Sequence, residues 1–462
     1  MGSGSRTITA RISKLAAPLA PAGLTPRVLG VCRWFGLEPR PRPRVLVSHL
    51  TLELRAGSIT MLIGPSGSGK TSILRELMAR FPATCDVGRV SPPANLPVVE
   101  AVAVDRPLTE ALSILSACGL GEPRLWLRRF EELSDGERFR ARLAYTLGLH
   151  LSVQSLSPIL CDEFAAPLHR RAAKAMAFGL RKLVSRTGLC FVAAGANDDL
   201  IADLQPDRTV RLVGDGQALV MLAEPVDRPV SFAQGLTIEP ASRREYDRFS
   251  AMHYRSRDEL GFVDRCFVMR EEPDGEPLGI VVYAHPPLEL RLRNQATGGR
   301  FQRNPRRLNR EVRVLRRLVI HPDVRGCGLG QRLVGETLPR VGTRFVECLA
   351  NMGQVNPVFE KAGMRRIGLC GQPPELKRIQ QELAALEVDP LSPEFVSQVC
   401  RRPRVRRLVA AAVRLWYRGL TGGGACRVER QSAAFLARTY RQMAGSAPVY
   451  YLWERPEMKD ER

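Results

Sequence analysis

Gly64-Pro65-Ser66-Gly67-Ser68-Gly69-Lys70-Thr71 follows the apolar run 59–63 and precedes the helix-like segment 72–77. Its glycines allow backbone N–H groups to point inward around a polyphosphate. Its lysine can reach the outer phosphates, and its final hydroxyl can ligate Mg²⁺ at a helix N-terminus. The sequence therefore predicts a strand, a nucleotide-binding loop and a helix. The residues expected to bind the phosphates are Gly64, Ser66, Gly67, Ser68, Gly69, Lys70, Thr71 and Ser72.

Length and composition indicate a multidomain protein. The chain has 462 residues, of which 44% are hydrophobic, and at about 150 residues per domain this predicts two or three domains. No apolar run reaches the roughly 18 residues of a membrane span, because Pro18, Pro21 and Pro26 interrupt the most apolar N-terminal stretch. That stretch also lacks an apolar block followed by a small-residue cleavage site, as a signal peptide would have. We therefore expect a cytoplasmic protein with no membrane partner.

Cysteine spacing and net charge indicate whether a zinc site and a polyanionic partner are expected. The eleven cysteines form no Cys-x-x-Cys pair, and there are only six histidines. The sequence therefore favours reduced, mostly buried thiols over a zinc site. The net charge is +22, and such an excess, mostly arginine, favours a polyanionic partner. The alternative is that a GC-rich genome inflates the arginine content.

Two further motifs follow the phosphate loop in chain order. Leu133-Ser134-Asp135-Gly136-Glu137 opens an amphipathic helix, and the apolar segment 157–161 ends in Asp162 and Glu163. Asp162 is suited to binding Mg²⁺, and Glu163 is suited to act as a base that orients or deprotonates an attacking water. The three motifs together predict Mg²⁺-dependent ATP chemistry.

In these motifs the chain resembles the ATP-binding-cassette (ABC) ATPases over roughly residues 28–224. The segment beginning at Leu133 is similar to the Leu-Ser-Gly-Gly-Gln signature of that family. The resemblance implies a head-to-tail homodimer formed with ATP. In it, Ser134 and Gly136 of one protomer close over the ATP held by Lys70 of the other.

Three further positions bear on the predicted ATP site. No glutamine occurs between Lys70 and Gln154, and Asp105, after an expected strand at 98–104, is a candidate to replace the metal-sensing glutamine of the ABC family. Asn197 stands where the resemblance implies a switch histidine, and an amide can bond a γ-phosphate without carrying a charge. Phe35 or Trp34 is a candidate to stack on adenine, although both could equally be core aromatics.

A second glycine-rich turn lies between the expected strand 312–320 and a helix. Its pattern Arg325, Gly328 and Gly330 resembles the Arg-x-x-Gly-x-Gly of the GCN5-related N-acetyltransferases (GNAT), over roughly 232–372. The resemblance implies binding of acetyl-CoA or a related acyl-CoA. Phe359 stands where that family often has a tyrosine acid. The residues implied to bind the donor are Leu318, Ile320, Arg325, Gly326, Gly328 and Gly330.

An ABC ATPase joined to an acetyltransferase-like domain is similar to a group of prokaryotic fusion proteins. Their transferase half resembles the phage Mom protein, which modifies adenine in DNA. His253 and Tyr254 look like the His-Tyr pair of that group and are the implied catalytic residues of this domain. The alternative is that both residues only pack the first helical region of the domain.

The segment 291–317 is dominated by positive charge. It holds ten arginines and one acid, Glu311, and such a run repels itself unless an anion binds. We therefore predict a nucleic acid, DNA or RNA, as the partner of flexible arginines in this segment. The residues expected to contact its phosphates are Arg300, Arg303, Arg306, Arg307 and Arg310.

The predicted fold class is α/β, with two catalytic domains in one chain. The expected organisation is an N-terminal extension at 1–27, an ABC-type P-loop ATPase domain at 28–224, a linker at 225–235, a GNAT-like mixed-sheet acyltransferase domain at 236–372, and a helical extension with a closing strand at 373–462. The leading hypothesis is an ATP-dependent acyltransferase acting on nucleic acid. The alternatives are an ATP switch whose transferase fold only binds nucleic acid, and an N-acetyltransferase for a protein or small amine.

Overall fold

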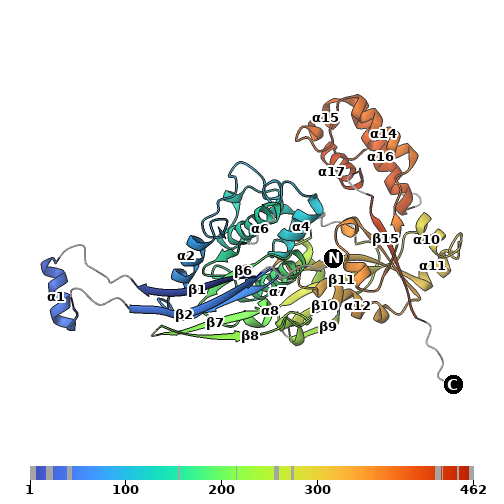
Figure 1. Cartoon of the computed structure of the whole chain (residues 1–462). Helices are drawn as coiled ribbons and strands as arrows, with labels where there is room; N and C mark the ends of the chain where they lie inside the picture. The colour runs from blue at the N-terminus through green and yellow to red at the C-terminus, as the bar shows by residue number, and fades with distance from the viewer. Residues whose placement is uncertain are drawn as a thin grey trace, which may run out of the picture. The chain divides into compact units, whose positions relative to one another are not determined.

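The protein forms two compact units in a computed structural model (Figure 1). The described residues are 7–16, 24–38, 44–153, 157–214, 216–253, 260–271, 275–421, 428, 430–444 and 447–456. The first unit comprises Met1–Gln234 with Pro322–Cys327, and the second comprises Gly235–His321 with Gly328–Arg462. The division after Gln234 falls in the expected linker 225–235.

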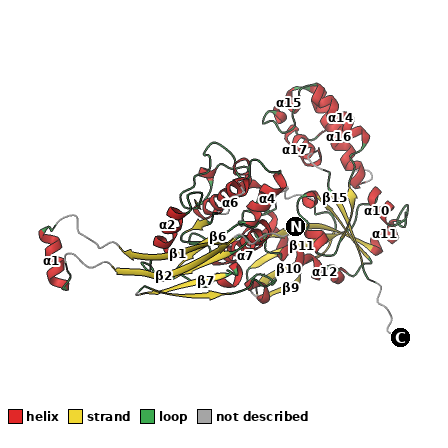
Figure 2. Ribbon diagram, in the orientation of Figure 1, coloured by secondary structure: helices red, strands yellow, loops and turns green. Residues whose placement is uncertain are grey.

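The first unit contains both strands and helices, as Figure 2 shows. Its described strands are β1 (Thr7–Ala16), β2 (Arg44–Arg55), β3 (Ile59–Ile63), β4 (Cys85–Asp86), β5 (Ile159–Cys161), β6 (Phe191–Gly195), β7 (Arg208–Gly214) and β8 (Gln217–Leu222). Its described α-helices are α1 (Pro26–Phe35), α2 (Lys70–Arg80), α3 (Val98–Ala101), α4 (Leu108–Ala117), α5 (Pro123–Trp126), α6 (Asp135–Val153), α7 (Arg170–Thr187) and α8 (Ile201–Leu204).

The larger sheet of the first unit has the strand order β4-β5-β6-β3-β7-β8. β3 lies between β6 and β7 and runs parallel to both, and β5 runs parallel to β6. All of β3 is buried, which explains why its sequence is apolar without alternation. The carboxyl ends of β3, β5 and β6 therefore lie at the same edge of the sheet.

β1 and β2 form a separate antiparallel ribbon that contributes to the core of the first unit. Ile12 is fully buried and belongs to the same hydrophobic cluster as Leu54 of β2 and Leu77 of α2. The assignment of residues 1–27 to an extension is therefore corrected for Thr7–Ala16. This strand is stabilised by partners distant in the sequence, which local periodicity does not reveal.

Residues 98–104 differ from the strand expected there. The chain forms α3 followed by turns, with Val98 and Ala101 buried. A short apolar run does not distinguish a buried strand from a buried helix. Asp105, which follows, is exposed.

The second unit is built on a seven-stranded sheet with the order β14-β15-β13-β12-β11-β10-β9. Its described strands are β9 (Leu236–Ala241), β10 (Val263–Glu271), β11 (Pro277–Ala284), β12 (Val312–Ile320), β13 (Phe345–Ala350), β14 (Arg365–Leu369) and β15 (Val449–Glu454). Its described α-helices are α9 (Glu245–Ser250), α10 (Arg291–Ala296), α11 (Pro305–Glu311), α12 (Leu329–Thr337), α13 (Val358–Lys361), α14 (Pro374–Ala385), α15 (Phe395–Arg401), α16 (Pro403–Thr421) and α17 (Ala433–Ala444).

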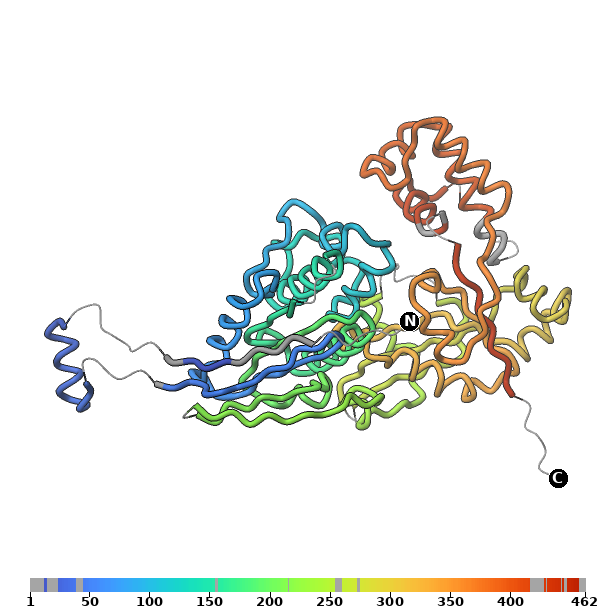
Figure 3. Tube along the Cα trace, in the orientation of Figure 1, coloured from blue at the N-terminus to red at the C-terminus, as the bar shows by residue number. Residues whose placement is uncertain are grey.

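β12 and β13 run parallel, with α12 between them in the chain, and the other neighbouring strands of this sheet are antiparallel. The C-terminal helices α14 to α17 share a hydrophobic core of their own. The chain then returns to the sheet as β15, drawn in red in Figure 3, and pairs with both β13 and β14. In the described part of the chain, no helix combines the length and the apolar character needed to cross a membrane.

A buried ion pair joins α10 to this sheet. Arg293 and Glu347 are both 0% exposed, and Arg293 Nη1 lies 3.1 Å from Glu347 Oε1. The Tyr450 hydroxyl donates to Glu347 Oε2 at 2.9 Å. Burial raises the pKa of Glu347, and the attraction of Arg293 and the Tyr450 hydrogen bond oppose that rise. One arginine of the basic segment is therefore part of the core.

We expect Glu347→Ala to lower the free energy of unfolding by about 3–5 kcal/mol, because it leaves the Arg293 charge buried without its partner. The double variant Arg293→Met, Glu347→Met should recover much of this loss, since it removes both charges. Urea unfolding followed by circular dichroism measures the change.

Glu382→Ala is the matched control. It breaks an exposed i,i+4 pair with Arg378 and should cost less than about 1 kcal/mol. Equal losses in Glu347→Ala and Glu382→Ala would contradict a structural role for the buried pair.

Candidate functional site

The phosphate loop occupies Gly64–Gly69, between β3 and α2. Gly69 has φ +102°, and a Cβ there would lie 3.0 Å from Leu46 Cβ. A Cβ on Gly64 would lie 2.9 Å from the Leu212 carbonyl oxygen. Only glycine fits these two positions without a shift of the surrounding atoms, so the packing of the sheet sets the shape of the loop.

Polar atoms of the loop fit a bound phosphate. The Lys70 ammonium donates to the carbonyl oxygens of Gly64 at 2.7 Å and Pro65 at 2.9 Å, which holds its charge at the loop. Among the described atoms, Ser68 Oγ is buried without a hydrogen-bond partner. A phosphate oxygen is an acceptor of the kind this hydroxyl lacks. Ser66 and Gly67 are exposed on the rim, and Ser72 is partly buried in α2.

The carboxylates after β5 meet the beginning of α2. Thr71 Oγ1 donates to Asp162 Oδ2 at 2.6 Å, so the hydroxyl and the carboxylate expected to hold Mg²⁺ are in direct contact. Mg²⁺ is usually held by one or two carboxylates together with substrate phosphates and waters, which fits this small donor set. No group of three or more His, Cys, Asp or Glu arranged for a metal occurs within the described ranges.

Glu163 follows Asp162 on an unusual backbone. Its φ is +49°, a conformation uncommon for a residue with a side chain, and its amide donates to Asp162 Oδ1 at 3.0 Å. The side chain is exposed. Local strain of this kind is found where a residue must be held in a set orientation, which suits a carboxylate that positions water.

Asn197 comes from a third strand end at the same edge. It is exposed and follows β6, the neighbour of β3. The two acids that follow it form ion pairs: Asp198 lies 2.9 Å from Arg211 Nη2, and Asp199 pairs with Arg170. The loop that carries Asn197 is therefore tied to both β7 and α7.

Ser134 and Gly136 lie at the N-terminus of α6. The Ser134 amide donates to Glu137 Oε2 at 2.9 Å, one half of a capping box. A Cβ on Gly136 would lie 3.2 Å from Leu168 Cδ2, so the beginning of α6 packs against the loop that follows Glu163. Glu137, the last residue of the signature-like segment, therefore also caps this helix, and an acid three residues after a serine is a recognisable sequence signal for such a cap.

Phe35 lies at the end of α1. Its side chain is 72% exposed, and no residue of α1 is buried. The alternative of an ordinary core aromatic is therefore incorrect for Phe35, and its contact with adenine stays a prediction.

Comparison with known proteins agrees with this geometry. The Fe(3+) ions import ATP-binding protein FbpC of Mesorhizobium japonicum is 30% identical over 158 residues, which is 32% of this chain and 41% of FbpC. The phosphate import ATP-binding protein PstB of Mycobacterium intracellulare is 38% identical over 63 residues, which is 14% of this chain and 20% of PstB. The first unit contains an ABC-type ATPase domain. The chain spans less than half the length of either relative, and no protein-family model matches it.

Solved ABC cassettes show low overall similarity to the whole chain. The dimeric structure of MJ0796, a bacterial ABC transporter cassette, is 18% identical with a TM-score of 0.32 and covers 40% of this chain and 94% of that one. The ADP conformation of MJ1267, an ATP-binding cassette of an ABC transporter, is 16% identical with a TM-score of 0.31. It covers 39% of this chain and 86% of that one.

The glycine-rich turn after β12 is divided between the two units. Arg325 and Gly326 belong to the unit that contains the ATPase domain, where Arg325 Nη1 donates to the Gly121 carbonyl at 3.1 Å. Burial lowers the pKa of Arg325. Gly328 and Gly330 belong to the second unit and begin α12, Gly328 with φ +91° and open space beside it. Of the six residues implied to bind the donor, Arg325 and Gly326 therefore belong to the first unit, and the other four belong to the second.

Leu318 and Ile320 lie at the end of β12. They pair with Val281 and Gly279 of β11 on one side. On the other side, the described pairing of β12 with β13 ends at Leu315 and Cys348.

The residues considered for acyl transfer come from different segments of the second unit. His253 is buried at 9% exposure, and Tyr254 lies outside the described residues. Phe359 is buried, with its ring 5.4 Å from the ring of Tyr451. The Tyr451 hydroxyl donates to Glu360 Oε1 at 2.9 Å. Tyr451 was not selected from the sequence, because only the sheet pairing of β15 places it beside α13.

The arginine-rich segment is ordered rather than a flexible loop, which corrects that expectation. Arg300 and Arg307 lie 2.8 and 3.1 Å from the Glu311 carboxylate, and Arg310 lies 3.3 Å from it. Burial works against the charged form of Glu311, but these arginines outweigh it and lower its pKa. Arg303 and Arg306 are exposed and lie outside this cluster.

Proposed function

We propose that the ATPase domain binds and hydrolyses Mg²⁺-ATP and that ATP closes two copies of the chain into a head-to-tail homodimer. The hydrogen bond between Thr71 and Asp162 carries this proposal, because it joins the phosphate loop to the carboxylates after β5. Lys70 and the loop amides hold the phosphates, Thr71 and Asp162 hold Mg²⁺, and Glu163 orients the water. Ser134 and Gly136 of one protomer complete the site of the other.

In this proposal the second unit carries the acyltransferase activity. It transfers an acyl group from acetyl-CoA or a related acyl-CoA to a nucleic acid, and the protein works in the cytoplasm. The parallel β12 and β13 with α12 between them support a GNAT-like fold. The pairing of β12 with β13 ends at Leu315, before Leu318 and Ile320. This supports binding of the donor beside Leu318 and Ile320.

The buried Phe359 and His253 favour keeping a second candidate. In it the second unit binds nucleic acid without transferring an acyl group, and the ATPase domain acts as a switch. An N-acetyltransferase for a protein or small amine is the remaining alternative, and it needs no exposed arginines.

We expect Glu163→Gln to retain ATP binding and to lower ATP hydrolysis at least about 100-fold, because loss of a general base costs roughly 10²–10⁴ in rate. With hydrolysis blocked, ATP and Mg²⁺ should convert the chain to a dimer. Phosphate release and light scattering measure the two effects.

Glu110→Gln changes an exposed acid of α4 that pairs with Arg106 and serves as the control with parental hydrolysis. Parental hydrolysis in Glu163→Gln would remove Glu163 from the mechanism. A monomeric Glu163→Gln chain saturated with ATP would count against the head-to-tail dimer.

For nucleic-acid binding we expect Arg303→Gln, Arg306→Gln to flatten the dependence of affinity on salt. Each phosphate contact on duplex DNA contributes about 0.9 to the logarithmic slope, so two contacts contribute about 1.8. Affinity should fall for many sequences alike, since phosphates carry no sequence information. Fluorescence anisotropy over a salt series measures the slope.

Lys377→Gln, Arg378→Gln removes the same charge from α14 and should leave the slope unchanged. An unchanged slope in the Arg303, Arg306 variant would leave these arginines as a solvated surface. The search for an acceptor would then move to proteins and small amines.

A further inference from the structure

A group of arginines without acids lies where α15 ends and α16 begins (Figure 1). Between Glu394 and Glu429 the sequence holds eight arginines, no lysine and no acidic residue. Five of the eight lie within residues 401–407, where a proline, Pro403, separates the two helices. We call the four exposed ones the junction arginines: Arg401, Arg402, Arg404 and Arg407.

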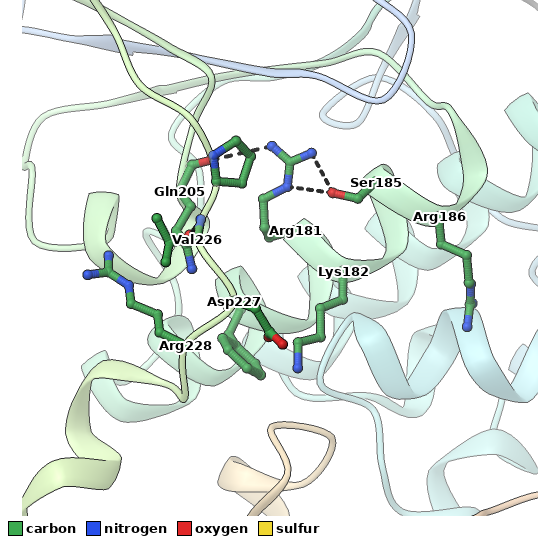
Figure 4. A pocket seen from close by; sticks show the side chains of 10 residues that line it. Arg181, Lys182, Ser185, Arg186, Gln205, Val226, Asp227 and Arg228 are labelled. Atoms are coloured by element: carbon green, nitrogen blue, oxygen red, sulfur yellow. Dashed lines mark hydrogen bonds between the residues drawn. The ribbon is translucent and has the colours of Figure 1, made fainter. Parts of the chain in front are cut away.

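The junction arginines differ from an arginine with a structural role. Arg181 of α7, shown in Figure 4, is buried, with its Nη1 2.6 Å from Asp207 Oδ2 and its Nη2 donating to Ser185 Oγ at 2.7 Å. In the part of the chain that the structure describes, none of the four junction arginines forms an ion pair with a carboxylate. Arg402 Nη1 donates to the Leu386 carbonyl oxygen at 3.2 Å, and this neutral acceptor leaves the charge of the guanidinium in place.

This arrangement is electrostatically unfavourable for the chain alone. α16 has no acid in its first turn, and Arg404, Arg406 and Arg407 lie within its first five residues. The N-terminus of a helix carries a partial positive charge that disfavours cations, and like charges three residues apart on a helix repel each other. An anion bound by the exposed arginine side chains would reduce both costs.

The packing of α16 indicates which anion fits. Val405, Val409 and Val413 are fully buried in the core shared by α14 to α17, so the helix offers a membrane positive charges but no apolar face to insert. Within residues 395–415 no large hydrophobic side chain is exposed, whereas the centre of a protein interface is usually apolar or aromatic. A polyanion held through its phosphates needs neither feature, and this favours a nucleic acid.

We propose that the junction arginines form a surface that binds the phosphates of a nucleic acid. The proposal rests on the nucleic-acid partner of the proposed function and adds a surface outside the segment 291–317. Arg404 and Arg407 are three residues apart on α16, so they are neighbours on the helix surface and can contact one stretch of phosphate backbone. Arginine binds phosphate through charge-assisted, often bidentate hydrogen bonds. Such contacts fix the position of the polymer and carry no sequence information.

The test uses the full chain with Arg404→Gln, Arg407→Gln and a mixed-sequence DNA duplex, with fluorescence anisotropy read over a salt series. Loss of two phosphate contacts should flatten the logarithmic dependence of affinity on salt by about 1.8. Lys377→Gln, Arg378→Gln removes the same charge from α14 of the same helical bundle and should leave the slope unchanged. Thermal melting followed by circular dichroism should find both variants folded, because the four side chains are exposed.

An unchanged slope in Arg404→Gln, Arg407→Gln would overturn this surface and leave the nucleic-acid partner of the proposed function in place. Arg303→Gln, Arg306→Gln separates the two surfaces, since it tests the segment 291–317 alone. A parent chain that binds no duplex even at low salt would overturn the partner and this surface together. Tighter binding to phosphatidylserine vesicles than to the duplex, lost in Arg404→Gln, Arg407→Gln, would assign the junction arginines to a membrane and overturn the proposal.

Discussion

The hydrogen bond from Thr71 to Asp162 depends on the strand order of the parallel sheet. The two residues are 91 positions apart in the chain. They meet because β3 and β5 both run parallel to β6, so their carboxyl ends lie at one edge. A reversed β5 would put Asp162 at the opposite edge, away from the phosphate loop. The nucleotide chemistry assigned to Lys70 and Glu163 therefore rests on this arrangement.

Features stabilised by neighbouring residues could be predicted from the sequence. The phosphate loop combines an apolar strand, glycines and a helix start within a few residues, and each signal is local. β1 could not be predicted in this way, because Ile12 is buried against residues of β2 and α2. The strand predicted at 98–104 was wrong for a related reason. The apolar character of these residues indicates that they are buried, but not whether they are buried as a strand or as a helix.

The basic segment shows why a charge count does not establish a binding surface. Arg293 is buried with Glu347, and Arg300, Arg307 and Arg310 surround Glu311. Glu347 comes from a strand outside the segment, so this pairing is set by the tertiary fold. The sequence therefore predicted an excess of positive charge, but only the structure shows which of these arginines lie beside a carboxylate and which do not.

The most direct test of the account is a double-mutant cycle on Thr71 and Asp162, reading ATP affinity with Mg²⁺ and with EDTA. Thr71→Val and Asp162→Asn should each lose most of the gain in affinity that Mg²⁺ provides. The double variant should lose little more than either single variant, a coupling of about 1–3 kcal/mol expected for groups that act on one ion. Full Mg²⁺ dependence in both single variants, or strictly additive losses, would contradict a shared metal site at the edge of this sheet.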